Sequence, residues 1–353
     1  MKRAITLVVV LVLVIGAISY LESKKAAPAQ TSSGPLIADK QAKYPLAPDF
    51  ADGTWFNTQP LHIKDLRGKV VLVDFWTYSC INCIRTLPYL TMWDEKYRDA
   101  GLVIVGVHTP EFDFEKVPDN VQKAIEKYGI KYPVVQDNDY LTWRAYHNQY
   151  WPREFLIDAD GFVRHDHIGE GGYEQTEMMI QGLLEEKAAR EGTPMNLTGT
   201  VQPGAQTDFR KILSPELYLG ALRRRHAGGN AEGYPVGQTV TYAEPTSRED
   251  NIPYNVGTWT NNPDTMELAS DTGTILLKYN AKQVNIVASA EPGSTIEAYV
   301  DGTQVMNEGD IINGTATIRD ERLYTVVDGE YGPHDLELRI AGKGFTIYTF
   351  TFG

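Results

Sequence analysis

The sequence contains only two cysteines among its 353 residues, Cys80 and Cys83. A scaffold held by several disulfides is therefore excluded, and a single chain cannot form a zinc site of four cysteines. Basic residues are outnumbered as well, because 33 Lys and Arg stand against 46 Asp and Glu and give a net charge of -13. This balance argues against a basic face that binds nucleic acid or an anionic membrane, so no nucleic-acid partner is expected.

Long apolar runs are limited to one segment at the N-terminus. Lys2 and Arg3 precede a mostly apolar run from Ala4 to Leu21, which approaches a membrane span at about 1.5 Å of helix rise per residue. We expect residues 1–25 to form an uncleaved signal anchor, because the run is longer than the core of a typical signal peptide. The protein is then a single-pass membrane protein with its folded domains on the extracytoplasmic side. Residues 26–44, rich in Pro, Ser, Thr and Ala, are expected to form a flexible linker.

The rest of the chain has a globular composition, and at roughly 150 residues per domain its length predicts two folded units. Residues 45–191 alternate strands with helices. Val70–Phe75 and Leu102–Val107 are near-continuous apolar runs, typical of buried strands in a largely parallel sheet. Between them, apolar residues recur every three or four positions from Ile84 to Tyr97, which predicts an amphipathic helix. Further expected elements are a hairpin of Thr54–Phe56 with Leu61–Ile63, a helix at Val117–Tyr128, a hairpin of Phe155–Asp158 with Phe162–Ile168, and a closing helix at Tyr173–Arg190.

The composition and the pattern of apolar residues change after this α/β region. Residues 192–235 are expected to form a connecting segment with a short helix at 214–216, where Ser214 can cap and Pro215 can open the first turn. Residues 236–353 alternate apolar and polar side chains with a period of two, separated by Asp-Gly and Asn-Gly turns. This pattern predicts an all-β sandwich.

The two cysteines form a Cys-x-x-Cys motif between the first buried strand and the amphipathic helix. The start of a helix presents free backbone N–H groups and a positive dipole end, which stabilise a thiolate at Cys80. Cys83 lies nearly one turn further on and can reach back to resolve a mixed disulfide, so the two thiols can close reversibly on each other. The predicted chemistry is dithiol-disulfide exchange that needs no cofactor beyond the redox-active Cys80–Cys83 disulfide.

A metal site is the alternative use of the same two cysteines. Zinc would need two further ligands, and the candidates are four histidines. We expect the histidines to be ordinary packed or solvated residues rather than metal ligands. The position of the cysteine motif between a strand and a helix also favours redox chemistry over metal binding. Peroxidase activity is less favoured, because no upstream cysteine offers a peroxidatic site. The four histidines are His108, His147, His165 and His167.

Residues 71–83, VLVDFWTYSCINC, resemble the active-site strand and loop of thioredoxin-fold proteins. The chain is most similar to TlpA/ResA-type redoxins and, closer still, to the extracytoplasmic C-terminal part of DipZ-type proteins. Further segments that resemble DipZ-type proteins are GVHTPEF at 106–112, GEG at 169–171, SPELYLG at 214–220 and FTFG at 350–353. The resemblance covers about residue 45 to the end, and it implies a thioredoxin fold followed by a jelly-roll domain that resembles carbohydrate-binding modules.

The resemblance also implies roles for individual residues. Asp74 matches the buried carboxylate that exchanges a proton with the resolving cysteine, and burial in an apolar strand is expected to raise its pKa. Pro152 matches the cis-proline that faces the cysteines, so Trp151 before it is expected to contact substrate. Trp76 and Ser79 are further expected substrate contacts, and Ser79 can alternatively cap the helix or bind the thiolate.

Two departures from thioredoxins concern the motif itself. Ser79 stands where many thioredoxins have Trp, and Ile81-Asn82 replaces Gly-Pro. Because of these two departures, the reduction potential of the cysteine pair stays open between about -270 mV, as in a reductant, and about -120 mV, as in an oxidant. DipZ-type proteins also carry a polytopic membrane domain, whereas this chain has one apolar segment. The resemblance therefore implies a separate membrane electron donor of the CcdA type.

The leading hypothesis is an extracytoplasmic thiol-disulfide oxidoreductase that reduces disulfide-containing proteins, with apocytochrome c as one candidate substrate. The rival is a cell-surface protein that binds a glycan or a protein through the β-sandwich. Four aromatic residues could stack on sugar rings, although such residues are more often core or rim packing. They are Tyr242, Tyr254, Trp259 and Tyr331.

Overall fold

The computed structural model describes residues 33–204, 207–225, 228–290 and 294–353. The chain divides into two compact units, Met1–Leu46 and Ala47–Gly353. The described part of the first unit contains helix α2 (Ser33–Lys43), where the sequence predicts a flexible linker; its last turns consist of Ala, Asp, Lys and Gln, most of them good helix formers. The predicted anchor at 1–25 lies outside the described residues. Among the residues that are described, no helix is both long and apolar enough to span a bilayer.

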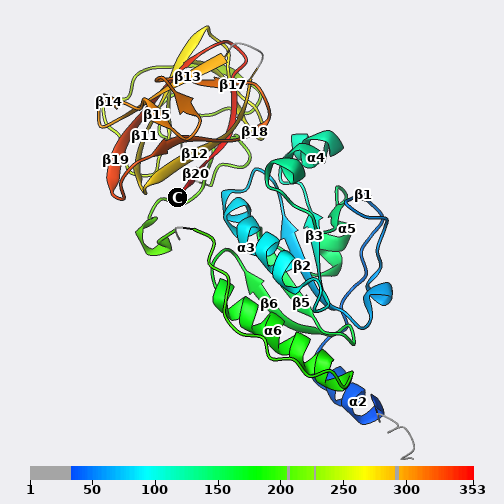
Figure 1. Ribbon diagram of the computed structural model, residues 1–353. Helices are drawn as coiled ribbons and strands as arrows, with labels where there is room; N and C mark the ends of the chain where they lie inside the picture. Colours follow the sequence, from blue (N-terminus) through cyan, green and yellow to red (C-terminus); the bar gives the residue numbers. More distant parts are fainter. Residues whose placement is uncertain (1–32, 205–206, 226–227, 291–293) are drawn as a thin grey trace, which may run out of the picture. The chain divides into compact units, whose positions relative to one another are not determined.

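The second unit begins with an α/β domain built on a six-stranded sheet in the order β1-β4-β3-β2-β5-β6 (Figure 1). Strands β2, β3 and β4 are parallel, whereas β5 pairs antiparallel with β2 and with β6, and β1 pairs antiparallel with β4. The strands are β1 (Thr54–Phe56), β2 (Val70–Trp76), β3 (Leu102–His108), β4 (Val134–Gln136), β5 (Arg153–Ile157) and β6 (Val163–Ile168). The predicted central strands and the β5–β6 hairpin are therefore confirmed.

Helices cover both faces of this sheet. Helices α3 (Ile81–Tyr97), α4 (Pro118–Lys127) and α6 (Tyr173–Arg190) pack on one face, and the short helix α5 (Leu141–Ala145) packs on the other. Strand β2 is buried along its whole length, and its side chains alternate between the two hydrophobic clusters. Leu72 and Trp76 point toward α3, whereas Val73 and Phe75 point away from it. Asp74 lies between Leu72 and Trp76 in this alternation, so its carboxyl faces the helix that carries the cysteines.

The predicted hairpin near the start of the domain is wrong. Thr54–Phe56 pairs with β4 about 80 residues later, and the segment predicted as its partner leads into a 3-10 helix, η1 (Ile63–Leu66). The amide of Asn57 donates to the carbonyls of Ile130 and Tyr132, at 3.0 Å each, and so fixes the distant pairing. Such a contact between remote segments leaves no local pattern in the sequence.

The C-terminal part of the second unit is largely β. Its main sheet runs in the order β14-β13-β19-β11-β9-β10-β20-β12-β18, with antiparallel pairing throughout. Inward side chains from both ends of this order meet in one hydrophobic cluster. The strands are β7 (Leu217–Tyr218), β8 (Thr239–Tyr242), β9 (Tyr254–Asn261), β10 (Met266–Leu268), β11 (Thr272–Asn280), β12 (Gln283–Ser289), β13 (Ser294–Val300), β14 (Thr303–Gln304), β15 (Asn307–Glu308), β16 (Ile311–Ile312), β17 (Ala316–Ile318), β18 (Arg322–Asp328), β19 (Pro333–Ala341) and β20 (Thr346–Phe352).

The short helix predicted at 214–216 is also wrong. This segment is extended and leads into β7, which pairs with β20. Ser214 does not cap a helix; its hydroxyl accepts a hydrogen bond from the backbone of Asn280 at 2.7 Å and donates to the side chain of Asn251 at 2.6 Å. Pairing with the sheet thus outweighs the local capping signal. A 3-10 helix, η3 (Phe209–Lys211), lies slightly earlier in the chain.

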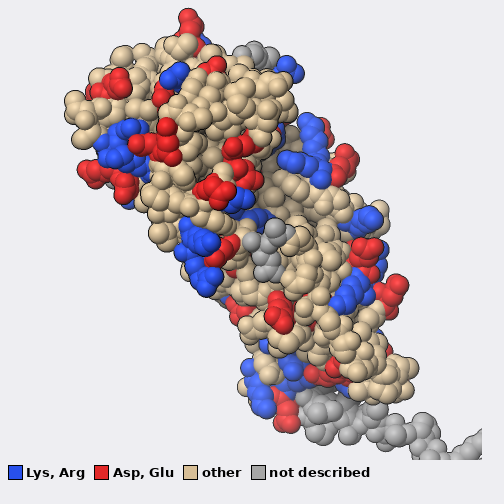
Figure 2. All heavy atoms as spheres, turned by 60° about the vertical axis from the view of Figure 1, so that its left-hand side comes forward, with Lys and Arg blue, Asp and Glu red and all other residues tan. Residues whose placement is uncertain are grey.

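Charged side chains are mixed on the surface. On the face shown in Figure 2, Lys and Arg side chains lie among Asp and Glu side chains. The surface also carries exposed ion pairs, such as Arg339–Glu337 at 2.6 Å. Exposed pairs of this kind contribute little to stability, about 0 to 1 kcal/mol each. Folding of the second unit therefore depends on its buried clusters rather than on its surface charges.

Gly106 on β3 provides a test of this packing. A Cβ atom at this position would lie 2.9 Å from Nε1 of Trp76 and 3.3 Å from Cε2 of Tyr132. We expect Gly106→Ala to lower the stability by about 1–3 kcal/mol, because the fully buried neighbours have little room to move. Denaturation by urea, followed by tryptophan fluorescence, measures the effect. Gly182→Ala is the control, because a Cβ on this exposed glycine of α6 meets nothing within 4 Å; an equal loss in both variants would contradict the assignment.

Candidate active site

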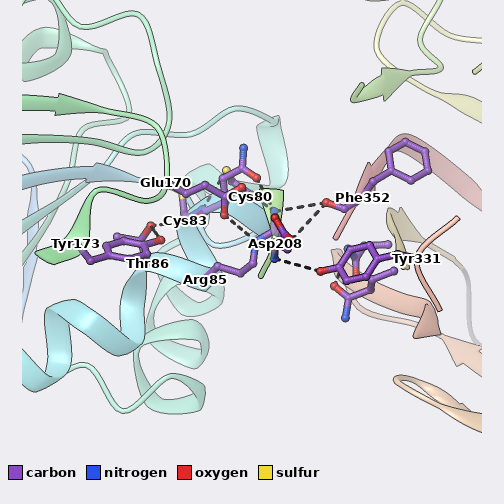
Figure 3. A network of polar contacts seen from close by, with 12 residues as sticks. Cys80, Cys83, Arg85, Thr86, Glu170, Tyr173, Asp208, Tyr331 and Phe352 are labelled. Carbon is purple, nitrogen blue, oxygen red and sulfur yellow. Dashed lines mark hydrogen bonds and ion pairs between the residues drawn. The ribbon is translucent and has the colours of Figure 1, made fainter. Parts of the chain in front are cut away.

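Cys80 occupies the N-cap position of helix α3, at the end of the loop that follows β2. Its Sγ accepts a hydrogen bond from the backbone N–H of Cys83 at 3.4 Å, and its carbonyl accepts from the N–H of Ile84 at 3.0 Å. The sulfur therefore lies where free N–H groups and the positive end of the helix dipole converge. Cys80 is half-buried and Cys83 is buried, and both are free thiols in this structure (Figure 3).

Burial determines the protonation of Cys83. Its side chain is 1% exposed and belongs to the hydrophobic cluster between the sheet and helix α3. Burial raises the pKa of the Cys83 thiol well above its usual value, and the hydrogen bond and charge of Cys80 and the charge of Asp74 raise it further. Cys83 is thus an uncharged thiol at neutral pH, and it needs a base before it can attack.

Asp74 lies on the same face of β2 as this cluster, with 1% of its surface exposed. Among the described residues, its Oδ1 atom has no hydrogen-bond partner. Burial raises the pKa of Asp74 well above its usual value, and the charge of Glu154 raises it further. The predicted burial of this carboxyl is confirmed by the structure.

Glu154 is a second buried carboxyl that the sequence did not indicate. It lies directly opposite Asp74 in the antiparallel pairing of β2 with β5, and it is 3% exposed. Its Oε2 atom also has no partner within the described part of the chain, and burial raises the pKa of Glu154 to about 7. The charge of Glu154 raises the pKa of Asp74, so an ionised Glu154 disfavours ionisation of Asp74.

Tyr132 extends the same buried polar cluster. Burial raises the pKa of its hydroxyl well above the usual value, and the charges of Asp74, Asp94, Glu154 and Cys83 raise it further. Its hydroxyl oxygen makes no hydrogen bond to any residue that the structure describes. The region beneath the cysteines therefore contains three ionisable side chains on neighbouring strands and loops, with spare capacity to donate or accept a proton.

Ser79 has a different role from those predicted. It is 1% exposed, and its hydroxyl donates to Oε1 of Glu115 at 2.5 Å. The Glu115 carboxylate also accepts from the backbone N–H groups of Ser79, Glu111 and Phe112. Burial and the charge of Glu111 raise the pKa of Glu115 to about 7. Ser79 therefore ties the loop before Cys80 to the 3-10 helix η2 (Asp113–Lys116). The prediction that it caps α3 is wrong, because Cys80 occupies the N-cap position, whereas its contact with substrate stays a prediction.

The two tryptophans predicted to contact substrate differ in their burial. Trp76 is the last residue of β2 and its side chain is fully buried in this structure, and its contact with substrate stays a prediction. Trp151 is half-buried, its indole N–H donates to the carbonyl of Thr109 at 3.0 Å, and its ring lies 4.3 Å from the ring of Trp143. The peptide bond between Trp151 and Pro152 is cis, as predicted, and Pro152 directly precedes β5.

Arg85 connects the first turn of α3 with the end of the chain (Figure 3). Its guanidinium donates to both carboxylate oxygens of Glu170, at 2.7 and 2.9 Å, and to Oδ1 of Asn82 at 2.9 Å. It also donates to the carbonyl of Phe352 on β20 at 3.3 and 3.4 Å. The sequence offered only a weak signal for this contact, in the GEG segment at 169–171.

The histidines do not support the zinc alternative. His108 is fully buried, its ring stacks on Tyr78, and burial lowers its pKa to about 3. His165 and His167 lie on β6, and His147 lies in the loop before Trp151. No three His, Cys, Asp or Glu side chains within the described residues are grouped so as to hold a metal ion.

Three of the four aromatic residues considered for sugar stacking lie in the β core. Trp259 is fully buried, Tyr242 is 2% exposed and Tyr254 is 5% exposed, so a sugar ring cannot reach them and the favoured interpretation, core packing, is confirmed for these three. Tyr331 is half-buried, and its hydroxyl accepts a hydrogen bond from the backbone of Asp208 at 3.2 Å.

Comparison with known proteins agrees with this geometry. Residues 45–166 match the AhpC/TSA family, and residues 214–353 match a family described as the thioredoxin-like C-terminal domain. Protein DipZ of Mycobacterium bovis is 38% identical over 312 residues, which are 87% of this chain and 43% of DipZ. The thiol-disulfide oxidoreductase ResA of Bacillus thuringiensis is 32% identical over 139 residues, which are 39% of this chain and 75% of ResA.

A solved structure, of a thiol-disulfide isomerase from Corynebacterium glutamicum, matches at 26% identity with a TM-score of 0.35, covering 39% of this chain and 96% of that one. The chain spans less than half the length of DipZ, whereas it covers three quarters of ResA. The match to ResA, together with the cysteine pair at the start of α3, shows that the chain belongs to the thioredoxin-like thiol-disulfide oxidoreductases, and over most of its length it is a homologue of DipZ.

Proposed function

We propose that this oxidoreductase reduces disulfides in extracytoplasmic proteins through the Cys80–Cys83 dithiol. One observation carries the proposal: a half-buried sulfur lies at a helix N-terminus, and a buried thiol lies behind it on the face that also holds two buried carboxyls, each with one oxygen that has no hydrogen-bond partner among the described residues. In this arrangement substrate can reach the nucleophile Cys80, whereas the thiol of Cys83 can lose its proton only to a buried group of the protein.

In the first step, the Cys80 thiolate attacks one sulfur of the substrate disulfide. The substrate S–S bond breaks, and a mixed disulfide joins Cys80 to the substrate. The other substrate sulfur leaves as a thiolate and takes up a proton. Because the N–H of Cys83 already points at Cys80 Sγ, the helix is oriented to stabilise negative charge on this sulfur.

In the second step, Cys83 gives its proton to the Asp74–Glu154 pair and attacks Cys80. The mixed disulfide breaks, the second substrate sulfur leaves as a thiolate, and the enzyme retains the Cys80–Cys83 disulfide. Two electrons have then passed from the dithiol to the substrate. A pair that shares one negative charge can accept this proton near neutral pH, because burial holds both carboxyl pKa values high.

We place substrate next to Trp151 and Pro152. The half-buried indole of Trp151 offers apolar surface, and the backbone of Pro152 leads directly into β5, the strand that pairs with β2. An extended substrate segment can form main-chain hydrogen bonds with the backbone of Trp151, just before this strand.

The oxidised enzyme needs two electrons for each further turnover. We propose that a membrane electron donor of the CcdA type supplies them, and that residues 1–25 hold the protein at the membrane with residues 45–191 and 236–353 outside the cytoplasm. Apocytochrome c is a proposed substrate among disulfide-containing extracytoplasmic proteins. The likeness to DipZ supports this arrangement, although the chain corresponds to 43% of that protein.

Replacement of each cysteine separates the two steps. We expect Cys83→Ser to accumulate a mixed disulfide between Cys80 and a substrate such as insulin, because the resolving thiol is gone. Cys80→Ser should form none and lose disulfide reduction. Non-reducing electrophoresis and intact-mass measurement detect the adduct. An adduct on Cys83 in the Cys80→Ser variant, at the rate seen for Cys83→Ser, would contradict the assigned order of attack.

Asp74→Asn tests the proton acceptor. We expect the mixed disulfide to resolve about a hundredfold more slowly, because general-base catalysis contributes about 10²–10⁴, whereas alkylation of Cys80 should change little. Quenched-flow trapping of the mixed disulfide measures the rate. Asp94→Asn is the matched control, because Asp94 is also a buried aspartate but pairs with Arg98, the C-cap residue of α3. Equal slowing in both variants would show that burial alone, and not Asp74, matters.

Glu154→Gln should change how stability depends on pH. The pKa of Glu154 is about 7 in the folded protein, above the usual value of 4.5, so the folded state loses stability as the pH rises through this window. At about 1.4 kcal/mol for each pKa unit, the variant should be up to about 3 kcal/mol more stable above pH 7 and should match the parent below about pH 4. Urea unfolding across the pH series tests this, and a constant difference at every pH would rule it out.

A further inference from the structure

The half-buried sulfur of Cys80 opens into a cavity of about 270 Å³ that both domains of the second unit line. Cys80, Asn82 and Arg85 form its walls on the α3 side, and Glu170 borders it. The opposite walls come from the C-terminal part of the chain, chiefly Phe209, Glu216 and the last strand, β20. A substrate disulfide that enters this cavity can therefore meet Cys80.

The wall formed by β20 is held at several points. Gly353 exchanges backbone hydrogen bonds with Gln283, at 2.7 and 2.9 Å. The carbonyl of Phe352 accepts from Arg85, whose ion pair with Glu170 is about 85% shielded from solvent. Charged hydrogen bonds of this kind are stronger than neutral ones. The end of the chain is thus anchored both to its own sheet and to the helix of the cysteines.

A second contact fixes the two domains farther from the cysteines. The carboxylate of Glu111 forms an ion pair with Arg223 at 2.7 Å and accepts a hydrogen bond from the hydroxyl of Tyr218. The rings of Phe112 and Tyr348 lie 4.9 Å apart. Val287 and Leu323 of the β domain belong to the same hydrophobic cluster as Cys83 and helix α3. Apolar and charged contacts together therefore keep the wall in place, so the size of the cavity is a lasting property of the site.

A larger cavity, of about 880 Å³, adjoins the first. The two share Arg85 and Phe209, and the larger one extends past Pro88 to the side chains of Tyr173 and Met178. Cavities that enclose drug-sized ligands measure about 300–1,000 Å³. The smaller one can therefore take a disulfide with its flanking atoms, and the larger one can take a few residues of chain beside it.

We propose, on the basis of the reductase function above, that the substrates are disulfides in flexible, extended segments of polypeptide rather than disulfides on rigid folded surfaces. Attack needs the two sulfurs to approach within about 3–3.5 Å in line. A segment of chain can reach that distance by entering the two cavities. A folded surface meets the wall of Phe209, Glu216 and β20 first and keeps its sulfur too far away.

The test compares one disulfide in two settings, a folded protein and the proteolytic peptide that carries the same disulfide. The pair is chosen so that dithiothreitol reduces both at equal rates. The full chain is reduced, freed of reductant and mixed with each substrate, and formation of the Cys80–Cys83 disulfide is followed by an alkylation gel shift. We expect the peptide to react at least about tenfold faster, because a misplacement of about 1 Å can cost a hundredfold in rate.

Two variants test the wall itself. Phe209→Ala with Glu216→Ala removes two partly exposed side chains from the cavity, and it should raise the ratio of the folded-protein rate to the peptide rate by at least about threefold. Leu213→Ala is the matched control, because Leu213 is 64% exposed in the same segment but does not line this cavity; it should leave the ratio unchanged. A circular dichroism spectrum of each variant confirms that it is folded.

The outcomes are distinct. Equal rates for peptide and folded protein in the parent, or the same ratio in the wall variant and the control, would overturn the proposal while leaving the reductase function intact. Faster reaction with oxidised glutathione than with the peptide would overturn the assignment to polypeptide segments. Failure of every disulfide to oxidise the dithiol would instead overturn the reductase function, and with it this inference.

Discussion

The placement of one neutral thiol in a dry interior constrains the rest of the site. Cys83 is buried against helix α3 and the sheet, and ionising it there would cost the hydration that a thiolate has in water. A nearby group must therefore take its proton at the moment of attack. Asp74 and Glu154 can do so because their register across β2 and β5 places two carboxyls opposite each other, and a charge on one disfavours a charge on the other. A single buried carboxyl would have its pKa raised by burial alone, without the effect of a second carboxyl.

The loop that presents Cys80 depends on another buried carboxylate. Glu115 accepts hydrogen bonds from Ser79 and from the backbone of η2, and Glu111 next to it pairs with Arg223 of the β domain. A buried ion that loses one partner is costly, often by about 3–5 kcal/mol. The loop, η2 and the β domain are thus linked by buried charged groups that are costly to leave unpaired. In this way the β domain can set the shape of the site although it contributes neither cysteine.

Much of the fold and part of the site follow from local sequence patterns. The apolar runs of β2 and β3 and the period of α3 are strong signals, and Asp74 stands out because apolar residues flank it on both sides. Glu154 and Glu115 could not be identified in this way, since one depends on strand register and the other on a loop contact 36 residues away. The errors have the same origin: β1 pairs with a distant strand, and the segment at 214–216 leads into β7, which pairs with the last strand, instead of forming a helix.

Proton transfer and the walled cavity support each other. Water that entered the site could protonate or deprotonate Cys83 directly and would weaken the shift that burial imposes on Asp74 and Glu154. Strand β20 lines the cavity next to Cys80, and an extended substrate segment in that cavity would exclude water from it. The carboxyl pair is then most effective as a base when substrate is bound, which is when the resolving thiol must ionise. A thioredoxin-like domain without this wall would leave Cys80 more open to solvent and would lose part of this coupling between binding and resolution.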